Sequence, residues 1–484
     1  SSVPRCASTM GRFALVPFLA AGFLLDESVV KDWQDAAASG VELVEETDQA
    51  QGPIRSVVAQ NPRLCDPGVN QSAGYVQVSE KARYFFWLFE SKSSPETDPL
   101  VMWLSGGPGC SSQLALFSEN GPCRVSSDGQ STEVNIFSWH QRANVIWVDQ
   151  PSGSGYSTGR DVNDEEGVAR NMYEFMQGFY AAHPKFRRSD FYLFGESYAG
   201  HYVPVVGHKL WLPTPAGDFR VPLKGLGIGN GMTDPEEQFR WYPMMARDGG
   251  EAEGGSLGHG VVDPQVLATM DAMVVPCTTQ IHSCNANNDT QACLNAYKIC
   301  MSAMITPYRA TGLNPYDMRA ECRGGGLCYN FTAVTKFLNR PAVQQKLGAS
   351  KAWATCNYKV NADFVSSGDW MKGFRHLLPP MLEDGIRILV YAGDVDYICN
   401  FLGNKKWTMA MKWRGSDKYR RAQDRAIRSE GRVARRVREG GGLTFTQVLQ
   451  AGHMVPLDQP AVSLDMLNEF VHVADTVNLV DVLI

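Results

Sequence analysis

The chain has 484 residues, of which 44% are hydrophobic and 20% charged, a balance that excludes a disordered or fibrous protein. Its 45 Lys and Arg against 51 Asp and Glu give a formal net charge of −6. Nucleic-acid binding needs a basic surface, so we expect no nucleic-acid partner. By length, the chain could hold about three domains or one large α/β domain with insertions.

The N-terminal region has the features of a secretory leader. Arg5 and Arg12 lie before or at the start of an apolar run over residues 13–25. Residues 26–60 are polar, acidic and without periodicity, so we expect a pro-segment or spacer there. The chain has 12 cysteines, which is typical of an oxidising compartment. We therefore predict a signal peptide over residues 1–25 and a route through the secretory pathway, to a vacuole or lysosome or out of the cell.

Two further patterns fit that route. Apolar runs stay shorter than the ~18 residues of a membrane span, so we expect no membrane anchorage. Three Asn-x-Ser/Thr triplets predict glycosylation at Asn70, Asn288 and Asn330.

Apolar runs of strand length alternate with helical patterns through most of the chain. The runs 75–78 and 84–89 flank a short polar turn and predict an antiparallel hairpin at a sheet edge. A helix is predicted between Asp164 and Ala182, where apolar residues repeat at helical spacing before a proline. Further strands are expected over 100–104, 145–148, 191–194, 226–228, 386–391 and 444–449.

This alternation predicts an α/β fold with a mostly parallel central sheet flanked by helices. The pattern lapses between about 235 and 380, where cysteines cluster among Asn, Gly and Pro residues. We therefore expect the first part of the core over 61–234, a disulfide-stapled cap or lid insertion and the return to the core over 235–380, and the second part of the core over 381–484.

Residues 412–440 contain nine arginines and few acidic residues. We expect a solvated surface helix or loop there rather than a binding patch, because the remainder of the chain is net acidic.

The sharpest chemical signal is the segment Gly195-Glu-Ser-Tyr-Ala-Gly200. It follows the strand expected at 191–194 and opens an apolar helix, so Ser197 occupies a strand-turn-helix elbow. Small neighbours are needed because the serine backbone is strained and its hydroxyl must project above the sheet. Ala199 stands where the usual pattern has glycine. The segment predicts that Ser197 is a nucleophile.

The partners of such a serine follow it in the order acid, then histidine. Asp394 and Asp396 come after the strand expected at 386–391, and either could be the acid. His453 follows the last expected strand. The histidine would accept the serine proton and return it to the leaving group, while the acid would orient the imidazole.

A glycine-rich segment, Ser105-Gly-Gly-Pro-Gly-Cys110, follows the strand expected at 100–104. A backbone N–H of its glycine pair and that of Tyr198 could stabilise an oxyanion. A phosphate loop would end in Lys-Ser/Thr, which is missing here. The chain has no paired Cys-x2-Cys, so we expect no metal, and we expect no cofactor.

Four segments of the chain together resemble those of a known family. They are Trp103–Ser112, Gly195–Pro204, Tyr391–Asn400 and Gly452–Pro456, and they resemble the signatures of serine carboxypeptidases, closest to carboxypeptidase Y and vacuolar plant relatives. The likeness runs from about Cys65 to the C-terminus and implies an α/β-hydrolase fold. It implies an enzyme that releases C-terminal, preferably apolar residues from peptides through an acyl-enzyme, with an acidic pH optimum.

The resemblance also implies the roles of individual residues. The catalytic triad would be Ser197, Asp396 and His453, and the oxyanion hole would be formed by Gly107 and Tyr198. The substrate pockets would be lined or supported by Trp103, Ile398, Cys399 and Met454.

By the same resemblance, Glu119 and Glu196 share a proton and, with Ser105 and Gly106, bind the substrate carboxylate. Two adjacent carboxylates do not both ionise readily, so peptide release should fade as pH rises. Ser105 stands where carboxypeptidase Y has asparagine, which we expect to change carboxylate affinity by about 1 kcal/mol.

The resemblance further implies five disulfides and leaves Cys399 free. The pairs are Cys65–Cys123, Cys110–Cys356, Cys277–Cys300, Cys284–Cys293 and Cys322–Cys328.

Two other functions stay open on sequence alone. One is an acyltransferase or esterase of the same fold, in which an alcohol replaces water or only esters are cleaved. The other is a stabilising partner protein with secondary catalysis, whose contact would be the Arg-rich segment 412–440. The expected partners of the leading function are peptide or protein C-termini, and we expect a monomer or homodimer.

Overall fold

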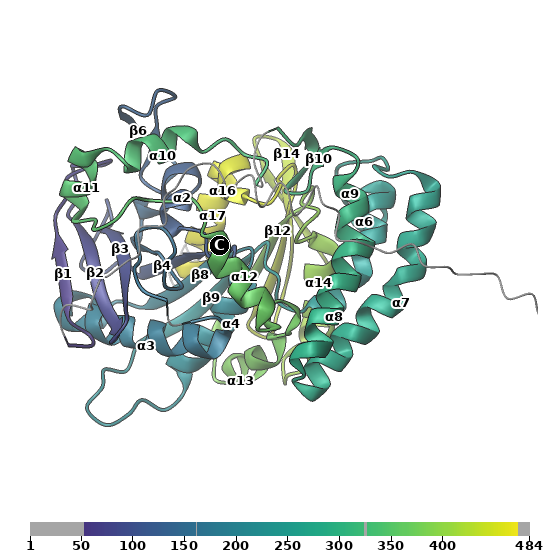
Figure 1. Ribbon diagram of the computed structural model, residues 1–484, viewed down its shortest axis with the longest axis horizontal. Helices are drawn as coiled ribbons and strands as arrows, with labels where there is room; N and C mark the ends of the chain where they lie inside the picture. Colours follow the sequence, from purple (N-terminus) through teal and green to yellow (C-terminus); the bar gives the residue numbers. More distant parts are fainter. Residues whose placement is uncertain (1–52, 161, 324–326, 473–484) are drawn as a thin grey trace, which may run out of the picture. The chain divides into compact units, whose positions relative to one another are not determined.

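The computed structural model describes residues 53–472 apart from 161 and 324–326, and Figure 1 shows how their helices and strands are arranged. The predicted signal peptide and most of the predicted spacer lie outside the described residues. Among the described residues, no helix is both long and apolar enough to cross a membrane.

An eleven-stranded sheet forms the centre of the described part, in the order β1-β2-β3-β7-β4-β8-β9-β12-β15-β14-β13. The six adjacent strands from β7 to β15 run parallel, with antiparallel strands on both sides of them. The prediction of a mostly parallel central sheet is therefore confirmed. The strands are β1 (Val57–Gln60), β2 (Gln71–Ser79), β3 (Ala82–Phe89), β4 (Leu100–Ser105), β7 (Asn144–Val148), β8 (Phe191–Glu196), β9 (Leu223–Gly229), β12 (Arg387–Gly393), β13 (Arg425–Ser429), β14 (Arg432–Gly440) and β15 (Leu443–Val448).

Helices cover both faces of this sheet because its central strands are apolar on both sides. Met102 and Leu104 of β4 pack with α3 (Glu165–Ala182) and α4 (Ala199–Trp211). Val101 and Trp103, which alternate with them, pack with α2 (Ser112–Ser118) and α17 (Pro460–Val471). In Figure 1, α2 and α3 lie on opposite sides of the central strands. The result is a layered α/β/α core.

One edge of the sheet corrects the predicted boundary of the spacer. The expected hairpin is β2–β3, but β1 pairs with β2 outside it and occupies residues 57–60 of the segment predicted as spacer. Most of β1 is exposed, so it carries no alternating apolar pattern. Arg55 anchors this end through ion pairs with Glu174 and Asp218.

The other edge corrects the prediction for the Arg-rich segment, which forms α15 (Ser416–Arg421) and the strands β13 and β14. Arginines at a sheet edge point to solvent or pair with acids, so the segment reads as polar although it is extended. Buried Arg435 pairs with Glu469, and Arg438 pairs with Asp424.

The chain between β9 and β12 is mainly helical. Its longest helices, α7 (Pro264–Asn287) and α8 (Thr290–Cys300), lie side by side in Figure 1 and are joined by Cys277–Cys300 and Cys284–Cys293. A small sheet of β10 (Leu313–Asn314) and β11 (Asp317–Glu321) follows. The other α-helices there are α5 (Pro235–Gln238), α6 (Tyr242–Asp248), α9 (Thr306–Arg309), α10 (Thr332–Leu338), α11 (Pro341–Leu347), α12 (Tyr358–Ser366) and α13 (Leu378–Glu383).

Short elements complete the described chain. A second small sheet pairs β5 (Cys123–Val125) with β6 (Thr132–Val134), and two more helices are α14 (Phe401–Ala410) and α16 (Val455–Asp458). Single turns of 3-10 or π type are η1 (Trp139–Gln141), η2 (Pro184–Arg188), η3 (Phe239–Trp241), η4 (Glu251–Glu253), η5 (Met301–Ile305), η6 (Asp369–Met371) and η7 (Arg375–Leu377).

Five disulfides join the described cysteines, and they are the pairs that the resemblance implied: Cys65–Cys123, Cys110–Cys356, Cys277–Cys300, Cys284–Cys293 and Cys322–Cys328. Within the described residues, Cys399 is the free cysteine, and it is buried.

Candidate active site

The chemically interesting residues gather at one edge of the sheet. Parallel strands all end at the same edge, and ligands bind in α/β proteins at that edge. The strands β4, β8, β12 and β15 end there and are followed by Gly106, Ser197, Asp396 and His453, respectively. Four segments far apart in sequence are therefore brought together by strand pairing.

Ser197 lies at a strained turn between β8 and α4. Its φ of 68° is in the left-handed region that non-glycine residues rarely adopt. The turn is held because Ser197 N–H donates to Gly229 O (3.1 Å) and Met232 N–H donates to Ser197 O (3.0 Å). This strained, half-buried serine has the backbone of the nucleophile elbow that the sequence predicted.

His453 contacts Asp396 and not Asp394. Its Nδ1 lies 2.8 Å from Asp396 Oδ2, and both side chains are buried. The same carboxylate accepts from Asn230 Nδ2 (2.8 Å) and from Cys399 N–H (3.3 Å). Asp394 accepts instead from Gln450 N–H (2.8 Å). A fixed imidazole whose Nδ1 is engaged leaves Nε2 free for proton transfer.

Sequence reasoning missed two residues that hold this pair. Asn230 follows the predicted strand at 226–228, and its place at the carboxyl edge was a signal that could have identified it. Tyr316 carried no such signal, because it enters the site from the β10–β11 connection. Its carbonyl accepts from His453 N–H (2.7 Å), and its ring packs edge-on against the imidazole at 5.1 Å.

The glycine loop lies directly against the elbow. A Cβ on Gly106 would lie 2.3 Å from Tyr198 N and 2.7 Å from Glu196 O, so only glycine fits there. Gly107 has a φ of 114°, which again favours glycine. The backbone N–H groups of Gly107 and Tyr198 find no acceptor among the described residues. Two unengaged donors beside a serine can bind an oxyanion.

Glu119 and Glu196 form a buried carboxyl pair beside the serine. Glu119 follows α2 and Glu196 ends β8, and the two share a side-chain hydrogen bond. One oxygen of each, Oε2, has no partner among the described residues. Burial raises the pKa of Glu119 to about 7, and burial together with the charge of Glu119 raises the pKa of Glu196 well above its usual value. The pair therefore keeps a proton in acidic and neutral solution.

Ser105 precedes the glycine loop and has a free hydroxyl proton. Its Oγ accepts from Trp103 Nε1 (3.1 Å), and its N–H donates to Ser112 Oγ (2.9 Å). Trp103 is fully buried and packs edge-on against Trp139 at 5.2 Å. Its contact with the site is thus through Ser105, which it orients.

The other predicted pocket residues lie around the triad. Ile398, Cys399 and Met454 are each 9% exposed or less, and burial raises the pKa of the Cys399 thiol. Asp396, Cys399 and His453 form the one group of three potential metal ligands found within the described residues. Two of the three, His453 and Asp396, are already joined by a hydrogen bond.

A cavity of about 500 Å³ lies near the site and has a mixed lining, made of Leu327, Tyr329, Phe331, Thr332, Thr335, Lys336, Asn339, Thr355 and Tyr358. The Tyr329 ring packs 6.0 Å from that of Tyr316, which itself contacts His453, so a row of rings connects the triad with the cavity. The three predicted glycosylation sites, Asn70, Asn288 and Asn330, are all exposed, and Asn330 is adjacent in sequence to this lining.

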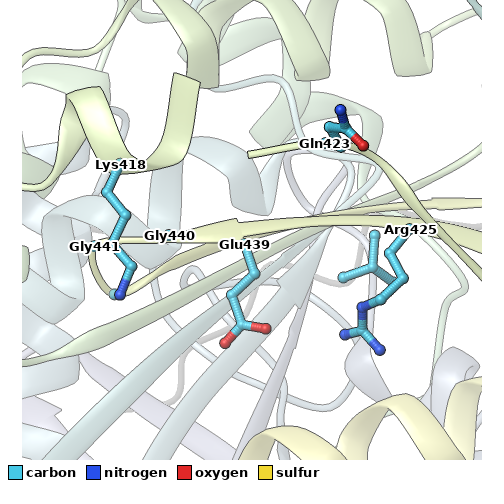
Figure 2. A pocket seen from close by; sticks show the side chains of 8 residues that line it. Lys418, Gln423, Arg425, Glu439, Gly440 and Gly441 are labelled. Atoms are coloured by element: carbon cyan, nitrogen blue, oxygen red, sulfur yellow. The ribbon is translucent and has the colours of Figure 1, made fainter. Parts of the chain in front are cut away.

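A second cavity, of about 370 Å³, lies at the Arg-rich edge of the sheet. Figure 2 shows Lys418, Arg425 and Glu439 around it, from α15, β13 and β14. Its lining carries both signs of charge, so it is not a uniformly basic patch.

A parallel sheet with a strained serine, an Asp-His pair and unengaged N–H groups at its carboxyl edge defines a serine hydrolase of the α/β-hydrolase fold. The comparisons with known proteins narrow this class. The chain belongs to the serine carboxypeptidase family, because the sequence model of that family matches residues 62–473.

The individual relatives agree with this family. Carboxypeptidase Y homolog A of Arthroderma gypseum is 39% identical over 416 residues, covering 84% of this chain and 74% of the relative. The homolog A of Trichophyton rubrum is 39% identical over 419 residues, covering 84% and 76%. Among solved structures, Kex1Δp, a prohormone-processing carboxypeptidase from Saccharomyces cerevisiae, superposes with a TM-score of 0.70 at 26% identity, covering 85% of this chain and 93% of its own.

Proposed function

We propose that this serine carboxypeptidase uses Ser197, Asp396 and His453 as its catalytic triad and reads the free end of its substrate with Glu119 and Glu196. The observation that carries the proposal is the position of the acid pair. Glu196 immediately precedes the serine, so a carboxyl group bound by the pair is held within one residue of the bond to be cut. Only the last peptide bond of a chain lies within one residue of a free carboxylate, so only that bond can reach Ser197 while the acid pair holds the carboxylate.

The first half of the reaction forms an acyl-enzyme. Ser197 Oγ attacks the last peptide carbonyl while His453 Nε2 accepts its proton, and Asp396 stabilises the imidazolium. The N–H groups of Gly107 and Tyr198 stabilise the oxyanion. His453 then gives the proton to the leaving amine, and the C-terminal amino acid departs. In the second half, water attacks the ester with His453 as base, which frees the shortened peptide and Ser197.

The acid pair supplies specificity for a free carboxylate. A protonated carboxyl can donate a hydrogen bond to the substrate carboxylate, while Ser105 Oγ and Gly106 N–H donate two more. When the pair loses its proton, its negative charge repels the substrate instead. We therefore propose an acidic optimum.

The surroundings support a preference for apolar residues and a secretory route. Ile398, Cys399 and Met454 surround the triad with apolar groups. The cavity beside Tyr329 adds three aromatic rings and Leu327 to a lining that is otherwise polar. Five disulfides favour an oxidising compartment. The substrates are then peptide C-termini within the secretory pathway, in a vacuole or lysosome or outside the cell.

The test is release of leucine from an N-acyl-Phe-Leu dipeptide at pH 5 by the wild type and by Ser197→Ala. We expect leucine release from the wild type and at least a 10⁴-fold lower rate from the variant. A radiolabelled phosphonofluoridate should modify Ser197 in the wild type, and a mass spectrum of the peptide identifies the site. Cleavage of esters without leucine release would favour an esterase or acyltransferase over a peptidase.

A further inference from the structure

A second pair of buried acids lies behind the residue that follows Ser197. Glu165 is the first residue of α3, and Asp369 is the first residue of η6; they are 3% and 1% exposed. The proposed reaction uses neither of them. Such acids are costly to bury, so their place in the fold calls for a function.

Asp369 is bonded to Tyr198. The Tyr198 hydroxyl donates to Asp369 Oδ1 (2.7 Å), and Glu165 N–H donates to Asp369 Oδ2 (3.2 Å). The Tyr198 ring is also stacked on His201 at 4.3 Å and packs against Trp370 at 5.7 Å. The tyrosine is therefore held both at its ring and at its hydroxyl.

This anchoring bears on catalysis because the hydroxyl and the backbone N–H of Tyr198 have different surroundings. Its hydroxyl is bonded inside the protein, while its N–H lies against Gly106 and finds no acceptor among the described residues. Tyr198 also makes no side-chain cap at the start of α4, so its side chain is fixed from Asp369. We propose that Asp369 is a positioning residue that, through the Tyr198 hydroxyl, aims the Tyr198 N–H at the oxyanion.

Glu165 completes the arrangement. Its carboxyl oxygens have no partner among the described residues, and burial together with the charge of Asp369 raises its pKa well above the usual value. A neutral Glu165 leaves Asp369 free to act as acceptor. The other titratable groups facing the pair are Asp164 beside Glu165, Lys372 after η6, Tyr198 just before α4, and His201 and Tyr202 of α4.

Tyr198→Phe removes the hydroxyl and keeps the ring and the backbone. Because misalignment of one donor should cost less than the 10²–10³-fold of its full loss, we expect kcat to fall about tenfold with KM within about twofold. A peptide boronate, whose adduct with serine carries an oxygen in the oxyanion hole, should bind about tenfold more weakly. Leucine, the other product, should bind unchanged, because its carboxylate contacts the acid pair and not the oxyanion hole.

The matched control is Tyr180→Phe on α3. Tyr180 is fully buried, and its hydroxyl has no partner among the described residues, so the same atom is removed without loss of a bond. We expect wild-type kcat and boronate affinity. If Tyr198→Phe behaves like Tyr180→Phe, the proposal is wrong.

A double-mutant cycle with Asp369→Asn tests the bond itself. The inserted amide disturbs the acceptors of Tyr198 and Glu165, so the double variant should lose no more than the more impaired single variant. Additive losses would contradict the proposal, and if Asp369→Asn does not fold, Tyr198→Phe decides alone. The inference rests on the proposed function, and Ser197→Ala distinguishes the failure of one from the failure of the other. If Ser197→Ala is active, the proposed function is wrong. If Ser197→Ala is inactive and Tyr198→Phe keeps wild-type boronate affinity, only the positioning role is wrong.

Discussion

Two buried acid pairs flank Ser197, and they differ in what their oxygens contact. In the front pair, Glu119 and Glu196 bond to each other and each keeps one oxygen without a protein partner. In the rear pair, both oxygens of Asp369 accept hydrogen bonds from the protein, one of them from Tyr198. Burial raises pKa values in both pairs, so titration alone does not distinguish them.

The comparison shows that the hydrogen-bond donors around a buried carboxyl group indicate its function better than its pKa does. A carboxyl pair that bonds only to itself among the described residues, and that lies beside a nucleophile, is suited to bind a ligand. A carboxyl group whose oxygens both accept from the protein fixes the groups that donate to it. The front pair should therefore act on substrate selection, and the rear pair on the rate of every substrate.

Among the acid-pair variants, the largest expected effect is that of Glu119→Ala, which breaks the front pair. It removes the partner that shares a proton with Glu196, and charge-assisted hydrogen bonds are each worth about 1.5–3 kcal/mol. We expect kcat/KM for N-acyl-Phe-Leu at pH 5 to fall about 100-fold. The C-terminal amide of the same dipeptide is the control, and an equal loss on both substrates would contradict a role in carboxylate binding.

The rear pair should make stability depend on pH. Burial raises the pKa of Asp369 from 3.8 to about 6, so the folded protein holds a proton that the unfolded chain has released. The stability that Asp369 contributes is therefore full below pH 4 and falls as pH rises through about 6, on the order of 2–3 kcal/mol. Thermal unfolding between pH 4 and 7 measures this fall.

Glu165→Gln is the variant that sharpens the stability prediction. It removes one of the two acids, so the fall with pH should be smaller than in the wild type. A variant curve that runs parallel to the wild-type curve would contradict the raised pKa of Glu165.

Variants of the rear pair should affect substrates with and without a free C-terminal carboxylate equally. Asp369→Asn is expected to lower kcat several-fold to about tenfold for both the peptide acid and its amide, because the oxyanion forms in both reactions. Steady-state kinetics on the two substrates measures this ratio. A loss of kcat confined to the peptide acid would indicate that Asp369 acts in binding the substrate carboxylate.

The smallest expected effect comes from Ser105→Asn at the front. An amide reaches further than a hydroxyl and adds one neutral hydrogen bond, about 1 kcal/mol or roughly fivefold in affinity. We expect a lower KM for the peptide acid and an unchanged KM for the amide. A raised KM for both would indicate that the asparagine displaces Trp103, whose indole bonds to Ser105.

Much of the fold, and the place of Ser197, Asp396 and His453 at the ends of strands, could be predicted from the sequence, because apolar strands and small residues at a strained turn leave local patterns. The runs around Ser197, Asp396 and His453 each ended at a strand terminus in the structure. The strands β1, β13 and β14 were missed because exposed edge strands lack an apolar face.

The supporting residues could not be predicted for a different reason. Tyr316 and Asp369 reach the site only through tertiary packing, and the residues near them in sequence give no chemical motif. Asn230 and Glu165 lie at the end of a predicted strand and the start of a predicted helix, where polar residues are common. Their roles depend on what they contact, which only the structure supplies.

The most direct test of the account is the pH dependence of kcat/KM for N-acyl-Phe-Leu divided by that for its C-terminal amide, between pH 4 and 8. Burial raises the pKa of Glu119 to about 7, so we predict a high, level ratio below pH 6 that falls by up to about tenfold per pH unit above pH 7. Dividing by the amide cancels the pH dependence of the catalytic steps that both reactions share. A ratio near one, or one that stays level to pH 8, would contradict the claim that a protonated Glu119–Glu196 pair recognises the free carboxylate.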